Sequence, residues 1–288
     1  MTPDFRLATR RSPLALAQAR AVADRIRHVH GDSVQVALVE IDSTGDLDRV
    51  SSVAALTQIG AFVRAVQAAV LDGRADAAVH SLKDLPAASP GGLVLIAFPE
   101  RADPRDVVVG STLDALRQGA LVGTGSPRRA AQLRLLRPDL QTRELRGNVA
   151  TRLDKVERGE VDAALLAAAG LQRLGMSEFA SEVLDVEAMV PAPGQGILVV
   201  ESLPEGPATE LLAAIDDPDL RPLAEVERLL LAETGAGCRS ALGALASRRN
   251  GMIRLHAFVE DERGPRRTEV TDEHPHDVVA SARKELGL

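Results

Sequence analysis

The feature that most constrains the fold of this chain is an internal repeat of two short patterns. Segments 11–13 (Arg-Ser-Pro) and 125–127 (Gly-Ser-Pro) each follow a predicted strand and open a predicted helix, with serine as the N-cap and proline at the first helical position. Segments 73–79 and 159–165 share the pattern Gly-x-x-Asp-Ala-Ala before an aliphatic residue. Chance could produce either match alone. Both matches in the same order indicate two α/β domains built on one plan.

Hydrophobic periodicity and turn residues predict the order of strands and helices. Apolar residues at helical spacing after Pro13 predict a helix as far as His30, which Gly31 ends. The same reasoning predicts strands at 6–9, 34–41, 77–79, 93–98, 107–109, 121–123, 141–145, 161–167, 197–201 and 252–259, and further helices at 62–70, 127–136, 149–158, 168–174, 223–230 and 278–286. Segment 42–60 is rich in polar and small residues and is predicted to be a long loop.

Proline-containing segments at 101–105 and 218–222 predict the places where the chain passes from one domain to the next. We therefore expect a first α/β domain of residues 1–98 with 197–217, a second α/β domain of residues 99–196, and a third, smaller α+β domain of residues 218–288. A length of 288 residues is sufficient for two or three domains.

Composition excludes several classes of function. The chain has no Trp or Tyr and five Phe, so it lacks the aromatic platforms on which nucleic-acid bases stack, and its net charge of −7 disfavours a polyanion-binding surface. No signal peptide or membrane span is predicted. Cys238 is the only cysteine, which excludes an internal disulfide, fits a reducing cytoplasm and leaves no paired Cys/His spacing for a metal. We expect a soluble cytoplasmic protein without a metal, nucleic-acid or membrane partner.

Arginines gather at the predicted strand-to-helix turns. The free N–H groups of a capped helix terminus attract anions, and the guanidinium group binds carboxylates and phosphates with two parallel bonds. Each arginine alone could belong to a solvated face. Together they predict a ligand with several anionic groups, held by both domains; they are Arg10, Arg11, Arg128, Arg129, Arg146, Arg152 and Arg173.

The best candidate for chemistry is segment 77–86, in which a buried strand runs into a polar loop that ends at Pro86. In open α/β sheets ligands bind beyond the carboxyl ends of strands, and Asp84 there could hold a charged nitrogen or act as an acid–base group. A surface turn with an ion pair is the alternative. Lys83 could form a Schiff base but is more simply a carboxylate anchor, and His80 is predicted to be a hydrogen-bonded core residue. The glycine-rich segment 123–126 lacks the residues of a nucleotide-binding loop.

Six segments together resemble one known family, porphobilinogen deaminase (hydroxymethylbilane synthase). The resemblance runs in order from residue 6 to about residue 245, and the segments in combination are highly specific; they are 10–15, 78–84, 100–106, 123–129, 145–152 and 193–196. It implies three domains, of which the first two are like a type II periplasmic binding protein.

The resemblance also implies an activity and a cofactor. A dipyrromethane cofactor would be linked by a thioether to Cys238, and four porphobilinogen units would be joined head to tail with release of ammonia to give hydroxymethylbilane, in haem and other tetrapyrrole synthesis. Asp84 matches the aspartate that stabilises charge on the pyrrole nitrogens and handles protons. The positions matching cofactor-binding residues are Ser81, Lys83, Asp84, Thr124, Ser126, Arg128, Arg129 and Arg146. Those matching substrate-binding residues are Arg10, Ser12, Arg146, Arg152 and Arg173.

A family of this kind implies a monomer with porphobilinogen as its small-molecule partner. Two alternatives stay open at the level of sequence: a poorly active paralogue with the same fold, and a non-catalytic protein that binds a small polycarboxylate. Cys238, in a glycine-flanked loop where the family attaches its cofactor, favours the enzyme.

Overall fold

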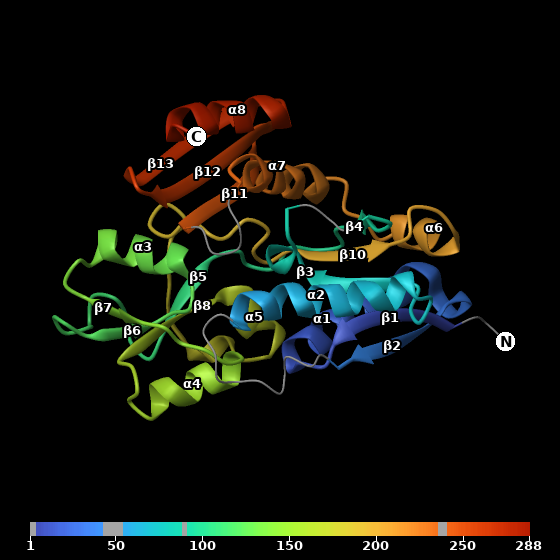
Figure 1. Ribbon diagram of the computed structural model, residues 1–288, viewed down its shortest axis with the longest axis horizontal. Coiled ribbons are helices and arrows are strands. Elements are labelled where there is room, and N and C mark those ends of the chain that lie inside the picture. Colours follow the sequence, from blue (N-terminus) through green and yellow to red (C-terminus); the bar gives the residue numbers. More distant parts are fainter. Residues whose placement is uncertain (1–3, 43–53, 88–90, 236–240) are drawn as a thin grey trace. The chain divides into compact units, whose positions relative to one another are not determined.

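The computed structural model describes residues 4–42, 54–87, 91–235 and 241–288. Its contacts divide the chain into two compact units, Met1–Arg101 with Ile197–Arg221, and Ala102–Gly196 with Pro222–Leu288. Each unit contains one five-stranded sheet, and the second unit also contains a separate three-stranded sheet (Figure 1). The predicted fold class, two α/β domains and a small C-terminal α+β domain, agrees with these three sheets. The residue boundaries of three domains stay a prediction.

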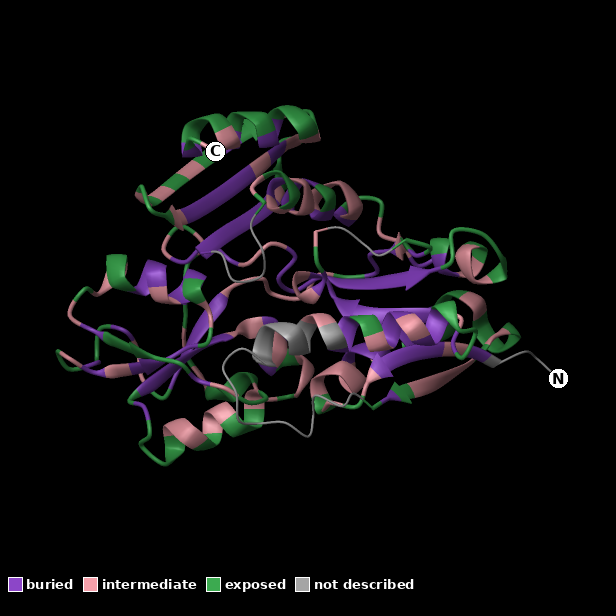
Figure 2. Ribbon diagram, in the orientation of Figure 1, coloured by how far each residue is buried: buried purple, intermediate pink, exposed green. Residues whose placement is uncertain are grey.

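The sheet of the first unit has the strand order β2-β1-β3-β10-β4. Its strands are β1 (Asp4–Arg10), β2 (Gln35–Ile41), β3 (Ala77–Ser81), β4 (Val94–Ala97) and β10 (Leu198–Ser202). β1 pairs in parallel with β2 and β3, whereas β10 is antiparallel to β3 and β4. Helices α1 (Pro13–His30) and α6 (Pro207–Ala213) pack on one face, and α2 (Ala54–Leu71) packs on the other. Both faces are covered, so β3 and β10 are buried along their whole length (Figure 2).

The sheet of the second unit repeats this arrangement, with the order β7-β6-β8-β5-β9. Its strands are β5 (Asp106–Val109), β6 (Leu121–Gly123), β7 (Gln141–Arg143), β8 (Ala163–Ala167) and β9 (Ala180–Val183), and its helices are α3 (Pro127–Leu136), α4 (Val149–Glu157) and α5 (Ala168–Arg173). β6 is parallel to β7 and β8, and β5 is antiparallel to β8 and β9. The prediction of two α/β domains with one plan is confirmed.

The Ser-Pro half of the repeat works as a helix cap in both units. The Ser12 hydroxyl accepts a hydrogen bond from the Ala15 backbone N–H at 3.3 Å, and the Ser126 hydroxyl accepts one from the Arg129 N–H at 3.4 Å. Both serines have extended backbone angles and are followed by proline at the first helical turn. The cap satisfies one of the N–H groups that a helix start leaves unbonded.

In each unit, the aspartate of the repeat helps to fix the register of a pair of parallel strands, β1 with β3 and β6 with β8. A carboxylate oxygen of Asp76 accepts the Arg6 backbone N–H at 2.7 Å, and the Asp76 N–H donates to the Arg6 carbonyl at 2.9 Å. Asp162 forms the same two bonds with Leu121, at 2.7 and 2.8 Å. In each unit the aspartate therefore adds a side-chain hydrogen bond beside the backbone hydrogen bond between the two strands. Both bonds lie at the start of the strand that precedes the capped helix.

The C-terminal part of the second unit is a three-stranded antiparallel sheet in the order β11-β12-β13. Its strands are β11 (Ala241–Arg249), β12 (Met252–Asp261) and β13 (Gly264–Asp272), and its helices are α7 (Leu220–Glu233) and α8 (Pro275–Leu286). Val226 and Leu230 of α7 and Val278 and Val279 of α8 share one apolar cluster with β11 and β12. This is the predicted small α+β element.

Several elements differ from the sequence predictions. The predicted loop 42–60 is wrong at its end, because α2 already begins at Ala54. Strands β9, β11 and β13 and helix α6 were not predicted. β13 carries charged residues and is mostly exposed or half-buried, so it lacks the apolar alternation by which a strand is predicted; pairing with β12 along its length makes it a strand.

Candidate functional site

The loop that carries Asp84 is held from both sides by buried leucines. β3 is followed by a 3-10 turn over Leu82–Asp84, and the Leu82 N–H donates to the Ile197 carbonyl at 3.0 Å, just before β10. Leu82 and Leu85 are buried, whereas Asp84 is half-buried. The carboxylate is therefore presented at the carboxyl end of a rigid strand, where α/β sheets bind ligands.

A buried polar cluster lies at the same end of β3. One carboxylate oxygen of Glu201 on β10 lies 3.1 Å from Nε2 of His80 and accepts a hydrogen bond at 2.8 Å from the Gln67 side-chain amide on α2. All three side chains are buried. His80 is buried, as predicted, but its Nε2 forms no hydrogen bond among the described residues, so the predicted hydrogen bond is not seen at this atom. Glu201 and Gln67 gave no signal in the sequence.

Removal of the Glu201 side chain should destabilise the protein measurably. Glu201→Ala leaves the side-chain amide of Gln67 buried without this hydrogen-bond acceptor, which typically costs about 1–3 kcal/mol of unfolding free energy. Denaturant unfolding of the variant and the parent measures the difference. Glu210→Ala is the matched control, because Glu210 is exposed on α6 and should change the stability by less than about 0.5 kcal/mol. Equal stability of both variants would contradict the assignment.

Two predicted substrate-binding residues lie at the carboxyl end of β1: Arg10 is its last residue and Ser12 follows it. This is the same edge of the sheet as Asp84, because β1 and β3 run in parallel. The guanidinium carbon of Arg10 lies 3.9 Å from the centroid of the buried Phe62 ring, which fixes its direction. The Ser12 hydroxyl caps α1. Arg11, by contrast, forms exposed ion pairs with Glu40 and Asp42, at the carboxyl end of the neighbouring strand β2.

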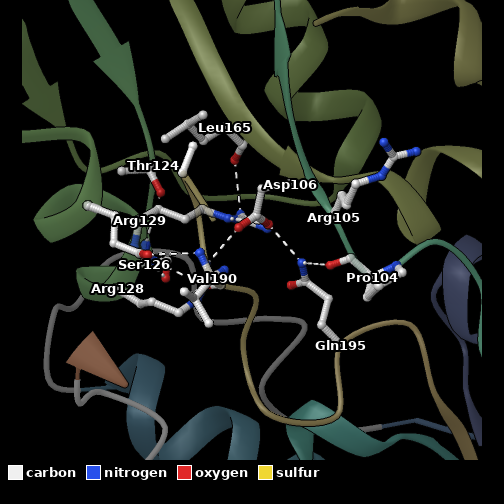
Figure 3. A network of polar contacts seen from close by, with 12 residues as sticks. Pro104, Arg105, Asp106, Thr124, Ser126, Arg128, Arg129, Leu165, Val190 and Gln195 are labelled. Carbon is white, nitrogen blue, oxygen red and sulfur yellow. Dashed lines mark hydrogen bonds and ion pairs between the residues drawn. The ribbon is translucent and has the colours of Figure 1, made fainter. Parts of the chain in front are cut away.

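The two adjacent arginines of the second unit converge on a buried aspartate (Figure 3). Arg128 donates from Nη1 to Asp106 at 2.7 Å and to the Val190 carbonyl at 2.6 Å. Arg129 donates from Nε and Nη2 to the other oxygen of Asp106, at 3.0 and 2.7 Å, and from Nη1 to the Leu165 carbonyl at 3.0 Å. Asp106 is fully buried, and the arginines are 3% and 6% exposed.

The pKa values of Asp106 and Arg128 depend on the neighbouring charges of this cluster. Burial alone would raise the pKa of Asp106, but the charges and hydrogen bonds of Arg128 and Arg129 outweigh it and hold that pKa well below its ordinary value. Burial lowers the pKa of Arg128, Asp106 partly offsets this, and the charge of Arg129 lowers it further. The two arginines thus favour the ionised form of Asp106. Asp106 lies in the family-like segment 100–106, but no role was predicted for it.

Two further residues that are predicted to bind substrate, Arg152 and Arg173, lie on the helices that follow β7 and β8. Arg152 donates from Nε to the Gly147 carbonyl at 2.9 Å, and burial together with the charge of Arg129 lowers the pKa of Arg152 to about 10. A guanidinium with a lowered pKa gains from a bound anion. Arg173 donates to the Gly196 carbonyl at 2.7 Å.

Thr124, Ser126 and Arg146 stand on the turns after β6 and β7. The Thr124 hydroxyl is buried and accepts the Ser126 N–H at 3.2 Å, which shapes the turn before α3. Arg146 pairs with Glu144 at 2.8 Å. Within the second unit the carboxyl ends of β6, β7 and β8 therefore carry this part of the predicted set. Ser81, at the end of β3 in the first unit, is buried, and Lys83 beside Asp84 is half-buried.

Cys238 lies outside the described residues, so the predicted attachment site has no structural account. In the described part of the chain, no group of three or more His, Cys, Asp or Glu side chains could hold a metal ion. Nor does any described helix combine the length and apolar character required to cross a membrane.

Comparison with solved structures adds little, since the similarity is low. The "Methionine Binding Protein, MetQ" aligns over 80% of this chain and 94% of that chain, with 12% identity and a TM-score of 0.43. The fold assignment rests instead on the strand orders.

Comparison with protein families and curated proteins is decisive. The family model described as "Porphobilinogen deaminase, dipyromethane cofactor binding domain" matches residues 5–210. The porphobilinogen deaminase of Acidothermus cellulolyticus is 47% identical over 268 residues, which cover 90% of this chain and 80% of that protein. Porphobilinogen deaminase 1 of Streptomyces coelicolor is 48% identical over 250 residues, covering 84% and 77%. This chain belongs to the porphobilinogen deaminase family.

Proposed function

We propose that this chain joins four porphobilinogen molecules head to tail, with release of ammonia, to give hydroxymethylbilane. Family membership supports the reaction, and one structural observation supports the ligand class. The buried pair Arg128 and Arg129 has one aspartate as its counter-charge, so it keeps a net positive charge that a carboxylate can neutralise. Porphobilinogen carries an acetate and a propionate on its ring, which fits this requirement.

The side chains present fit a dipyrromethane cofactor. Nε of Arg128 is buried and has no acceptor among the described residues, and Arg152 has a lowered pKa. Both groups would gain from a carboxylate. Arg128, Arg129, Arg146, Ser126, Thr124 and Lys83 would hold the carboxylates of the cofactor, and the Cys238 thiol would carry it. When bound, the cofactor supplies the pyrrole carbon to which the first substrate unit is joined.

Asp84 would be the catalytic group. Its carboxylate would accept hydrogen bonds from pyrrole N–H groups, stabilise the positive charge that develops on ring nitrogen, and take up or return a proton. The buried leucines on both sides hold the turn, so the carboxylate need not reorganise during the reaction. The arginines bind carboxylates at the ring periphery and leave the nitrogens to Asp84.

Incoming substrate would be held by Arg10, Ser12, Arg146, Arg152 and Arg173. Arg10 is oriented by its contact with Phe62, and Arg173 by the Gly196 carbonyl. Fixed guanidinium groups bind carboxylates with a smaller loss of side-chain entropy than mobile ones. The Ser12 hydroxyl already caps α1 as an acceptor, so its O–H remains available as a donor to a carboxylate.

We further propose that the protein acts in the cytoplasm as a monomer, with no protein, nucleic-acid or membrane partner. A thiol that must stay free to form a thioether supports a reducing compartment. The acidic net charge of −7 disfavours nucleic acid as a partner. No observation favours the alternative of a non-catalytic polycarboxylate-binding protein.

An intact mass spectrum of the purified chain, combined with a product assay, tests the proposed function. We expect a mass above that of the polypeptide by one dipyrromethane, a pyrrole colour reaction, and formation of hydroxymethylbilane with ammonia from porphobilinogen. A bare polypeptide mass after incubation with porphobilinogen, together with absence of product, would reject the proposal.

Arginine substitutions should separate cofactor assembly from elongation. Arg129→Ala should impair cofactor loading, because it removes charge-assisted bonds worth roughly 1.5–3 kcal/mol each and also leaves Asp106 buried with a weaker counter-charge. Arg173→Ala should remain loaded and elongate slowly. Intact mass measures loading, and single-turnover ammonia release measures elongation. A fully loaded, fully active Arg129→Ala protein is incompatible with this assignment.

A further inference from the structure

The carboxylate of Asp106 accepts hydrogen bonds from three buried side chains. One carboxylate oxygen accepts from Arg128, and the other accepts from Arg129 and, at 2.8 Å, from the side-chain amide of Gln195 (Figure 3). The same Gln195 nitrogen donates to the Pro104 carbonyl at 2.7 Å. Gln195 approaches Asp106 from the side opposite the arginines, so the carboxylate is fixed from both directions.

The bonds of the two arginines to Asp106, Val190 and Leu165 leave part of their donor capacity unused. Two Arg129 nitrogens bond one aspartate oxygen, and Arg128 uses a single nitrogen for both Asp106 and Val190. The Nε of Arg128 is buried without an acceptor among the described residues. A guanidinium has five N–H groups in a fixed plane, so the direction set by Asp106 also sets the direction of the unused ones.

The charge count of the cluster is unbalanced. Two buried guanidinium groups face one carboxylate, which leaves one net positive charge in a site of low dielectric constant. Arg152 adds a further positive charge close enough for Arg129 to lower its pKa, but Arg152 is only half-buried and can be neutralised from solvent. The buried pair thus requires one more anion.

We propose that Asp106, held by Gln195, is a built-in counter-anion that orients Arg128 and Arg129 and limits the pair to one ligand carboxylate. This inference rests on the proposed function for the identity of that carboxylate. Asp106 is a positioning residue in this proposal, because it is fully buried and both of its oxygens accept hydrogen bonds from protein side chains. It keeps the pair from binding small anions indiscriminately before the cofactor is assembled.

Inorganic phosphate is a direct probe of the missing charge. All proteins are full-length chains with Cys238→Ser, so that no covalent cofactor occupies the arginines. Asp106→Asn should melt lower than its parent without phosphate, and its melting temperature should rise by about 3 °C for each tenfold increase of phosphate above its dissociation constant. If folded Asp106→Asn protein can be recovered only in the presence of phosphate, that outcome supports the proposal in the same way.

Two comparisons separate charge from packing. Asp103→Asn is the matched control, because it removes a carboxylate from a neighbouring, more exposed pair with Arg105, and it measures the general effect of phosphate on stability. Asp106→Asn combined with Arg128→Gln restores one net positive charge, so its phosphate response should return to that of the parent.

The proposal is overturned if, at the same phosphate concentration, phosphate raises the melting temperature of Asp106→Asn no more than that of Asp103→Asn. It is also overturned if Asp106→Asn fails to fold at every phosphate concentration and the double variant fails as well, because packing alone would then explain Asp106. If the wild-type protein carries its cofactor and phosphate does not stabilise Asp106→Asn, only this inference is rejected. Wild-type protein without the cofactor rejects the proposed function instead.

Discussion

Asp84→Asn should give a folded, cofactor-loaded protein whose turnover is lower by about 10²–10⁴-fold. Loss of ammonia from each substrate unit leaves an electron-deficient pyrrole, and coupling leaves positive charge on ring nitrogen. A carboxylate facing those nitrogens stabilises both states and can relay the proton, whereas an amide of the same shape keeps an acceptor but loses the charge and the basicity. Loading should suffer less, because the arginines hold the carboxylates.

Single-turnover ammonia release, measured beside the intact mass, tests this expectation. Asp32→Asn is the matched control, because Asp32 is an exposed aspartate of the same unit. It should release ammonia at the parental rate. Near-normal release by Asp84→Asn would move the catalytic role to another residue, and His80, four positions earlier on β3, would be the first to test.

Cys238→Ser should abolish both the covalent adduct and product formation. Serine keeps the size of the side chain, but its hydroxyl is a far weaker nucleophile than a thiolate and does not form the thioether. Incubation with porphobilinogen followed by intact mass should show the bare polypeptide, and the pyrrole colour reaction should be negative.

Asp84→Asn is the informative partner of this variant, because it should carry the adduct and fail in turnover. The pair of variants separates attachment of the cofactor from use of it. An adduct of unchanged mass on Cys238→Ser protein would place the attachment on another residue.

Local interactions explain what the sequence predicted well. The Ser-Pro caps and the helix from Pro13 to His30 each depend on the intrinsic preferences of neighbouring residues, and these are readable from a single chain. Two copies of such patterns in the same order predicted two sheets of one plan, which the strand orders confirm. The position of Asp84 at the carboxyl end of a buried strand followed from the same local signals.

Long-range contacts decided the rest. Asp106 and Gln195 are 89 residues apart, and Gln67 and Glu201 are 134 apart, so no local pattern marks either pair. In the sequence, Arg128 and Arg129 are two cations free to meet a ligand; only the fold brings Asp106 between them and fixes how much of their charge remains. The sequence by itself determined most of the elements and which residue types stand at strand ends. The tertiary structure decided which charges are buried together, because burial and pairing depend on segments distant in sequence, and these set the direction and the net charge of the site.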